Sequence, residues 1–155
     1  MKVIVVGGGW AGTGAAIAAR NAGAEVTVLE RADMLLGTGL VGGIMRNNGR
    51  FTAAEEMIAL GANEIFETID DNCRHKNIDF PGHKHASLYD IALIEPAIKK
   101  LLQRKGIEVR TQARMKDVEM DGKKVKAVIL DSGEKVEGDV FIDATGSAGP
   151  MANCG

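Results

Sequence analysis

Two short apolar runs flank a helical stretch near the start of the chain. Residues 2–6 (KVIVV) and 25–29 (EVTVL) have the length of strands, and their β-branched runs are typical of strands buried on both faces. Between them, the alanine-rich residues 15–22 predict a helix, and Gly23 predicts its left-handed C-terminal cap. A strand, a helix and a strand within about 30 residues predict a βαβ unit, and therefore a parallel sheet.

The central part of the chain is more polar and less regular. Residues 31–50 hold five glycines and predict a loop. A helix is expected over residues 52–72, begun by a capping box of Thr52 and Glu55. Its six acidic residues and its lack of basic ones indicate a solvated face. Residues 73–88 are expected to be irregular.

The last third of the chain predicts one helix followed by short strands. Residues 94–104 predict a helix, with Pro96 tolerated only in its first turn. Apolar strands are expected at residues 107–111 and 140–143. Between them we expect an antiparallel meander with Asp-Gly and Ser-Gly turns, formed by residues 114–120, 124–130 and 134–137. The predicted fold is α/β, a Rossmann-like parallel sheet with a three-stranded antiparallel β-meander crossover.

Composition narrows the class of protein. The 155 residues suit one domain, and 45% apolar residues are too many for a disordered chain. A net charge of −2 argues against a dedicated nucleic-acid partner. Two cysteines imply no disulfide framework, and no apolar run reaches the length of a signal peptide or a membrane span. We therefore expect a soluble, cytoplasmic protein with no membrane partner.

A glycine motif carries the chemistry. Gly7-x-Gly9-x-x-Gly12 follows a predicted strand and opens a predicted helix. In this pattern the first glycine permits a tight turn, the second lets a pyrophosphate approach, and the third lets helix and strand pack closely. Glu30 ends the second strand, where a carboxylate accepts hydrogen bonds from ribose hydroxyls and repels a 2′-phosphate. The motif predicts a site for the ADP half of NAD or FAD, and disfavours NADP.

Two further stretches resemble a known family. The last strand runs into DATG at residues 143–146, and residues 35–43 read LLGTGLVGG. Over residues 1–149 the sequence resembles the two-dinucleotide-binding-domain flavoproteins, the group that contains glutathione reductase and fumarate reductase flavoprotein subunits. It is most similar to FAD-dependent oxidoreductases with a GG-x-x-T-x-G-L-V type of loop. Leu36 departs from this pattern, because relatives often have a first glycine there.

The resemblance implies FAD as the cofactor and gives roles to twelve residues. The pyrophosphate would lie against Gly7, Gly9, Ala11 and Gly12. The adenosine ribose would be held by Glu30, with Arg31 and the main chain of Met115 at the adenine end. The ribityl chain would pass Gly37, Thr38 and Gly39, and Thr145 and Gly146 would approach the pyrophosphate and ribityl region. The residue patterns by themselves support only the glycine motif and Glu30, and no catalytic residue is identified.

The function implied by the resemblance is flavin-dependent oxidoreduction, in which FAD accepts a hydride or an electron pair and passes it on. Two alternatives stay open: a non-catalytic flavin-binding module or subunit, and an NAD-using enzyme of the thiazole-synthase kind. The chain ends nine residues after Gly146. We therefore expect residues 1–155 to be an incomplete FAD-binding domain without a substrate domain, which self-associates or is completed by another chain. The small-molecule substrate or electron partner is not identified.

Weaker candidates lie outside the glycine motif. A C-x-H-x7-H-x-H pattern could supply zinc ligands, but its spacing favours a polar surface loop; its members are Cys73, His75, His83 and His85. A polar group beside the glycine loop could bind an anionic substrate, but favours a solvated loop; it comprises Arg46, Asn47, Asn48 and Arg50. Trp10 is expected to pack rather than to react, and Cys154 to be an inert thiol rather than a redox group. No metal is expected.

Overall fold

The computed structural model describes residues 1–40, 46–47, 55–81 and 83–146. It divides into two compact units, the first formed by Met1–Gly37 with Leu102–Gly155 and the second by Thr38–Leu101. Each unit has its own helices and strands.

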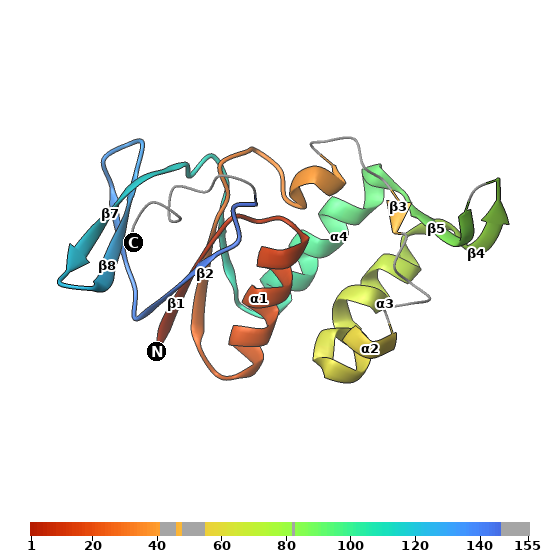
Figure 1. The fold of residues 1–155 in the computed structure, drawn as a ribbon, viewed down its shortest axis with the longest axis horizontal. Helices are drawn as coiled ribbons and strands as arrows, with labels where there is room; N and C mark the ends of the chain where they lie inside the picture. The colour runs from red at the N-terminus through yellow and green to blue at the C-terminus, as the bar shows by residue number, and fades with distance from the viewer. Residues whose placement is uncertain (41–45, 48–54, 82, 147–155) are drawn as a thin grey trace. The chain divides into compact units, whose positions relative to one another are not determined.

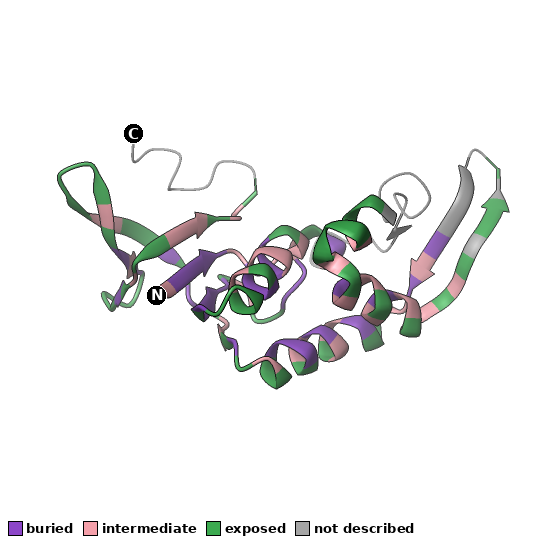
Figure 2. Ribbon diagram, turned by 90° about the horizontal axis from the view of Figure 1, so that it is seen from below, coloured by how far each residue is buried: buried purple, intermediate pink, exposed green. Residues whose placement is uncertain are grey.

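The first unit is built on a parallel sheet of four strands (Figure 1). The sheet order is β10-β1-β2-β6, and its strands are β1 (Lys2–Val6), β2 (Glu25–Leu29), β6 (Glu108–Arg110) and β10 (Val140–Asp143). All neighbouring pairs are parallel, with Val5 of β1 between Val28 of β2 and Ile142 of β10. The four positions that follow Lys2 are buried, as are those that follow Glu25 (Figure 2). The predicted βαβ unit and parallel sheet are therefore confirmed.

The helix α1 (Trp10–Asn21) connects β1 to β2 and contacts both strands and β10. It begins at Trp10, earlier than the expected start at residue 15, because Gly9 already serves as its N-cap. Gly23 has a φ of +87° and ends the helix in the left-handed conformation that its sequence position predicts. The side of α1 that is buried carries small residues or short branched ones: Gly12, Thr13, Ala16 and Ile17. Small residues on this side let the helix lie close to the strands.

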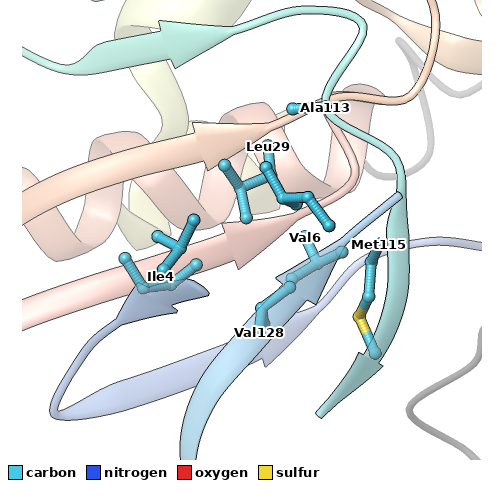
Figure 3. Close-up of a cluster of buried hydrophobic side chains, with 8 residues drawn as sticks. Ile4, Val6, Leu29, Ala113, Met115 and Val128 are labelled. Atoms are coloured by element: carbon cyan, nitrogen blue, oxygen red, sulfur yellow. The ribbon is translucent and has the colours of Figure 1, made fainter. Parts of the chain in front are cut away.

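An antiparallel meander packs on the sheet through a buried apolar cluster. Its strands are β7 (Met115–Asp121), β8 (Lys124–Leu130) and β9 (Lys135–Glu137), close to the predicted bounds. Figure 3 shows Ile4, Val6 and Leu29 of the sheet facing Met115 and Val128 of the meander. Burying one such aliphatic side chain contributes roughly 1.5–3 kcal/mol. This cluster fixes the meander on one face of the sheet, and α1 covers the other face.

The second unit contains a hairpin that the sequence did not predict. Strands β4 (Cys73–Phe80) and β5 (His83–Tyr89) pair antiparallel, and β3 (Arg46–Asn47) pairs with β5. The expectation of irregular structure over residues 73–88 is therefore wrong. Several register shifts interrupt the pairing of β4 with β5. Because such shifts break the strict alternation of polar and apolar residues, the strand pattern was hidden.

The helices of the second unit also depart from expectation. In place of one helix over residues 52–72, the structure has the segments α2 (Glu55–Met57), η3 (Ile58–Ala62) and α3 (Asn63–Asp71). Gly61, with a φ of +100°, interrupts the helical path within η3. The Thr52 end of the predicted capping box lies outside the described residues.

The helix α4 (Ile91–Arg104) begins in the second unit and starts earlier than expected. The Asp90 carboxylate accepts a hydrogen bond from the amide of Ala92 at 2.9 Å, which makes Asp90 its N-cap. Pro96 consequently lies in the second turn, and the prediction that it lies in the first turn is wrong. Within the described part of the chain, no helix is long and apolar enough to span a membrane.

Candidate functional site

The turn between β1 and α1 is packed too closely for side chains at two of its glycines. A Cβ atom on Gly12 would lie 1.8 Å from the carbonyl oxygen of Gly7. A Cβ atom on Gly7, whose φ is +104°, would lie 2.4 Å from the carbonyl oxygen of Ala144. Gly7 and Gly12 therefore let the start of α1, the end of β1 and the residue after β10 meet backbone to backbone, as the motif predicts.

Gly9 differs from these two glycines because its missing side chain leaves room. Its φ of −69° and ψ of −176° are open to any residue. A Cβ atom there would have one described neighbour within 4 Å, the Cα atom of Gly37 at 4.0 Å. This space lies at the N-terminus of α1, whose first turn holds no acidic residue. Backbone amides and the helix dipole favour an anion at such a place. We call this space at Gly9, with Gly37 opposite, the cradle. The cradle fits a pyrophosphate.

Glu30 lies beside this loop and is 6% exposed. One of its carboxylate oxygens accepts a hydrogen bond from the amide of Gly8 at 2.7 Å. The other accepts from the amide of Ala32 at 2.8 Å. A carboxylate has about four lone-pair sites, so both oxygens can still accept from ribose hydroxyls. The neighbouring Arg31 is exposed, and its role at the adenine end stays a prediction.

The segment after Glu30 returns to the glycine turn. The amide of Leu36 donates to the carbonyl oxygen of Gly8 at 2.8 Å, and Leu36 forms an isolated parallel bridge with Gly9. A Cβ atom on Gly37 would lie 3.4 Å from the Cα atom of Gly9. The structure thus brings Gly37 to the edge of the cradle at Gly9.

Thr38 and Gly39 follow in the 3-10 helix η1 (Gly37–Gly39) and belong to the second unit. The carbonyl oxygen of Gly39 accepts a hydrogen bond from the hydroxyl of Tyr89 at 3.2 Å, and both residues are buried. Sequence reasoning did not single out Tyr89. The contacts of Thr38 and Gly39 with the ribityl chain stay predictions.

The DATG turn after β10 touches the glycine turn through Gly7. The amide of Ala144 donates to the carbonyl oxygen of Val6 at 2.8 Å, which continues the sheet pairing beyond the strand. One carboxylate oxygen of Asp143 accepts from both the amide and the hydroxyl of Thr145, at 2.9 and 2.6 Å. Gly146 then takes a φ of +83°. Sequence reasoning gave roles to Thr145 and Gly146 but missed Asp143, although an Asp side chain commonly accepts a hydrogen bond from the backbone two residues further on.

The start of the meander is tied to Glu30. The amide of Ala113 donates to the carbonyl oxygen of Glu30 at 2.8 Å, just ahead of Met115. The side chain of Met115 belongs to the buried cluster under the meander and is 7% exposed. Only its main chain is therefore left for the predicted contact with adenine, which stays a prediction, as does the contact of Ala11 with the pyrophosphate.

The weaker candidates lie partly outside the part of the chain that the structure describes, which includes no side-chain placement for His83 or His85. The described residues contain no group of three or more His, Cys, Asp or Glu placed to hold a metal ion. The thiol of Cys73 donates to the carbonyl oxygen of Ile69 at 3.1 Å. Trp10, the first residue of α1, is half-buried. Asn48, Arg50 and Cys154 lie outside the described residues.

Comparison with known proteins gives the family. The FAD-dependent oxidoreductase family matches residues 2–155. An FAD-dependent monooxygenase from Nectria sp, ntnJ, is 29% identical over 152 residues, which are 94% of this chain and 36% of that protein. The chain thus spans about a third of the length of this curated relative.

Solved structures share the fold. The Diels-Alderase PyrE3 is 24% identical with a TM-score of 0.67, over 95% of this chain and 32% of that one. CtdE, solved in complex with FAD, is 20% identical with a TM-score of 0.65, over 99% of this chain and 40% of that one. The predicted α/β fold and the predicted cofactor, FAD, are confirmed, whereas the narrower group of glutathione reductase and fumarate reductase stays an expectation. This chain belongs to the FAD-dependent oxidoreductase family.

Proposed function

We propose that this chain forms the FAD-binding part of a flavin-dependent oxidoreductase, with the ADP half of FAD held at the turn between β1 and α1. The observation that carries the proposal is the cradle at Gly9. A Cβ atom there would meet no described backbone atom closer than 4.0 Å, yet the position is glycine and lies at a helix N-terminus. A pyrophosphate approaching the backbone is the physical reason for a glycine at such a place.

The residues around the cradle have complementary tasks. Backbone amides at the start of α1 donate to the phosphate oxygens, and the helix dipole favours their negative charge. Glu30, held by the Gly8 and Ala32 amides, accepts from the hydroxyls of the adenosine ribose. The same carboxylate repels a 2′-phosphate and so selects against a phosphorylated ribose.

The remaining predicted contacts complete the path of the cofactor. Gly37 lines the cradle opposite Gly9, and the amide nitrogen of Thr145 lies 3.0 Å from the position of a Cβ atom on Gly7. Bound FAD supplies the redox chemistry by taking up and passing on a hydride or an electron pair, while the protein supplies binding, orientation and electrostatics. The name of the relative ntnJ supports oxidoreduction as the reaction class of the whole protein, with monooxygenation as its finer form.

The test is to identify and titrate the cofactor. The purified chain should show flavin absorbance, or take up added FAD, and release FAD on denaturation for detection by mass spectrometry. A Gly9→Val variant should lose FAD binding while keeping its far-UV circular dichroism, because the space at Gly9 is open and its backbone angles suit valine. Release of NAD or an NAD adduct instead of FAD would support the thiazole-synthase-like alternative. Full FAD binding by Gly9→Val would refute the proposed site.

A further inference from the structure

Leu36 has a backbone conformation that is unusual for its residue type. Its φ is +74°, and among the described residues only Leu36 and Gln112 are non-glycines with a positive φ. In this left-handed region the Cβ atom of an L-residue crowds the following carbonyl oxygen, so glycine is strongly favoured. A glycine at this position would take the same conformation without strain.

Two features hold Leu36 in this conformation. Its side chain is 1% exposed, so packing fixes it. Its amide donates to the carbonyl oxygen of Gly8 at 2.8 Å, and it bridges to Gly9. Strained backbone of this kind persists only where the surroundings over-determine it, and such positions cluster at functional sites.

The consequence of the strained conformation appears at the next residue. Gly37 also has a positive φ, +53°, so two successive left-handed residues turn the chain across the glycine turn. This path brings the Cα atom of Gly37 to 4.0 Å from the position of a Cβ atom on Gly9. Gly37 is thereby the described backbone nearest to the cradle.

We propose that Leu36 is a positioning residue for FAD: its left-handed backbone, locked by its buried side chain, holds Gly37 opposite Gly9 and so shapes the pyrophosphate site. The proposal rests on the proposed function of the Gly9 cradle. Leu36 itself touches no reacting atom, and it acts through the placement of Gly37.

The test compares Leu36→Gly with Leu36→Ala. Both variants lose the buried side chain, but only alanine keeps the steric penalty of a positive φ. Without the side chain to hold it, the loop of the alanine variant relaxes, and FAD binding has to restore the left-handed path. We expect Leu36→Gly to bind FAD more tightly than Leu36→Ala, by up to roughly 5- to 30-fold. The dissociation constants are measured at a temperature where circular dichroism shows every variant to be folded.

Leu35 offers a matched control. It is fully buried and adjacent, but it has no positive φ. At ordinary backbone angles glycine is less favourable than alanine, so Leu35→Gly should bind FAD no more tightly than Leu35→Ala. Tighter FAD binding by the glycine variant than by the alanine variant, seen at Leu36 but not at Leu35, would therefore report the positive φ. Loss of packing by itself does not produce this difference between the two positions.

Two further variants keep the side chain large in case truncation unfolds the chain. Leu36→Ile and Leu36→Met have similar volumes, but a β-branched residue tolerates a positive φ least. Leu36→Ile should therefore bind FAD more weakly than Leu36→Met. The positioning role is overturned if Leu36→Gly binds FAD as tightly as Leu36→Ala, and Leu36→Ile as tightly as Leu36→Met. The proposed cradle still stands in that case, provided that the wild-type chain binds FAD and Gly9→Val does not. If Gly9→Val binds FAD like the wild-type chain, the proposed function itself fails.

Discussion

The carboxylate of Glu30 accepts a hydrogen bond from the amide of Gly8 at 2.7 Å, which ties the end of β2 to the turn after β1. Its second oxygen accepts from Ala32, so the carboxylate is fixed from both sides and nearly buried. Glu30 thus holds the shape of the glycine turn in addition to its proposed contact with the ribose. The two tasks can be separated by substitution.

Replacing Glu30 should reduce both stability and FAD affinity. Glu30→Ala leaves the amides of Gly8 and Ala32 without acceptors, which costs about 1–3 kcal/mol of unfolding free energy for the buried Gly8 amide and less for the partly buried Ala32 amide. The ribose hydroxyls also lose a charged acceptor, worth about 1.5–3 kcal/mol, so FAD affinity should fall roughly 10- to 150-fold. Urea denaturation measures the first effect and FAD titration of the folded variant measures the second.

Glu30→Gln is the matched control for this prediction. Its size is unchanged, but one oxygen is replaced by an amide group that can only donate. It therefore cannot accept from Gly8 and Ala32 at once, and we expect FAD affinity between those of the wild-type chain and Glu30→Ala. Equal affinity of all three proteins would remove Glu30 from the cofactor site.

Alanine at either Gly9 or Gly12 should weaken FAD binding, but only alanine at Gly12 should also destabilise the fold. In Gly12→Ala the new Cβ atom would meet the carbonyl oxygen of Gly7 at 1.8 Å, and this main-chain atom cannot move aside as the end of a flexible side chain would. Overpacking typically costs 1–3 kcal/mol or more, so this variant should lose stability together with FAD. In Gly9→Ala the space is open, so the chain should stay folded and FAD affinity should fall by about tenfold or more. Circular dichroism and FAD titration distinguish the two cases, and unfolding of Gly9→Ala would contradict this account.

The parts that sequence patterns predicted are those set by local sequence. The runs at residues 2–6 and 25–29 are apolar enough to be buried on both faces, the run at residues 140–143 is a shorter apolar one, and all three are strands of the parallel sheet. The motif also predicted that Gly7 and Gly12 have no room for a side chain, because its spacing is typical of a tight strand-to-helix turn.

The parts that were missed depend on contacts between distant residues or on backbone angles. The buried hydrogen bond from Tyr89 to Gly39 joins positions fifty residues apart and leaves no local pattern. The left-handed conformation of Leu36 is held by its surroundings against its own preference. The Asp90 cap was missed because the helix was expected to begin at residue 94, so that Pro96 would lie in its first turn.

Asp143 should influence FAD binding through Thr145. Its carboxylate oxygen accepts from both the amide and the hydroxyl of Thr145, which orders the turn that leads to Gly146. Asp143→Ala removes this acceptor. Because both bonds to the carboxylate are exposed to solvent, their net contribution is about 0.5–1.5 kcal/mol, so FAD affinity should fall about 2- to 10-fold. Asp143→Asn keeps an oxygen at the same place and should restore most of the affinity. If both variants bind FAD like the wild-type chain, the turn does not contribute to the site.

The cap of α4 should make stability depend on acid pH. The amide of Ala92 donates to one oxygen of Asp90 and Arg74 donates to the other at 2.8 Å, and these contacts lower the pKa of Asp90 below its ordinary value of 3.8. Because the folded pKa is the lower one, the stabilisation is complete above pH 3.8 and is lost as the pH falls through the folded pKa. Asp90→Asn can still cap Ala92 but carries no charge, so its stability lacks this dependence. The wild-type chain should have a higher thermal midpoint than Asp90→Asn at pH 7, and this difference should shrink as the pH is lowered to 3. When both proteins also carry Arg74→Ala, the difference at pH 7 should be smaller. Parallel pH profiles of the two proteins would show that the Asp90 charge does not stabilise the helix.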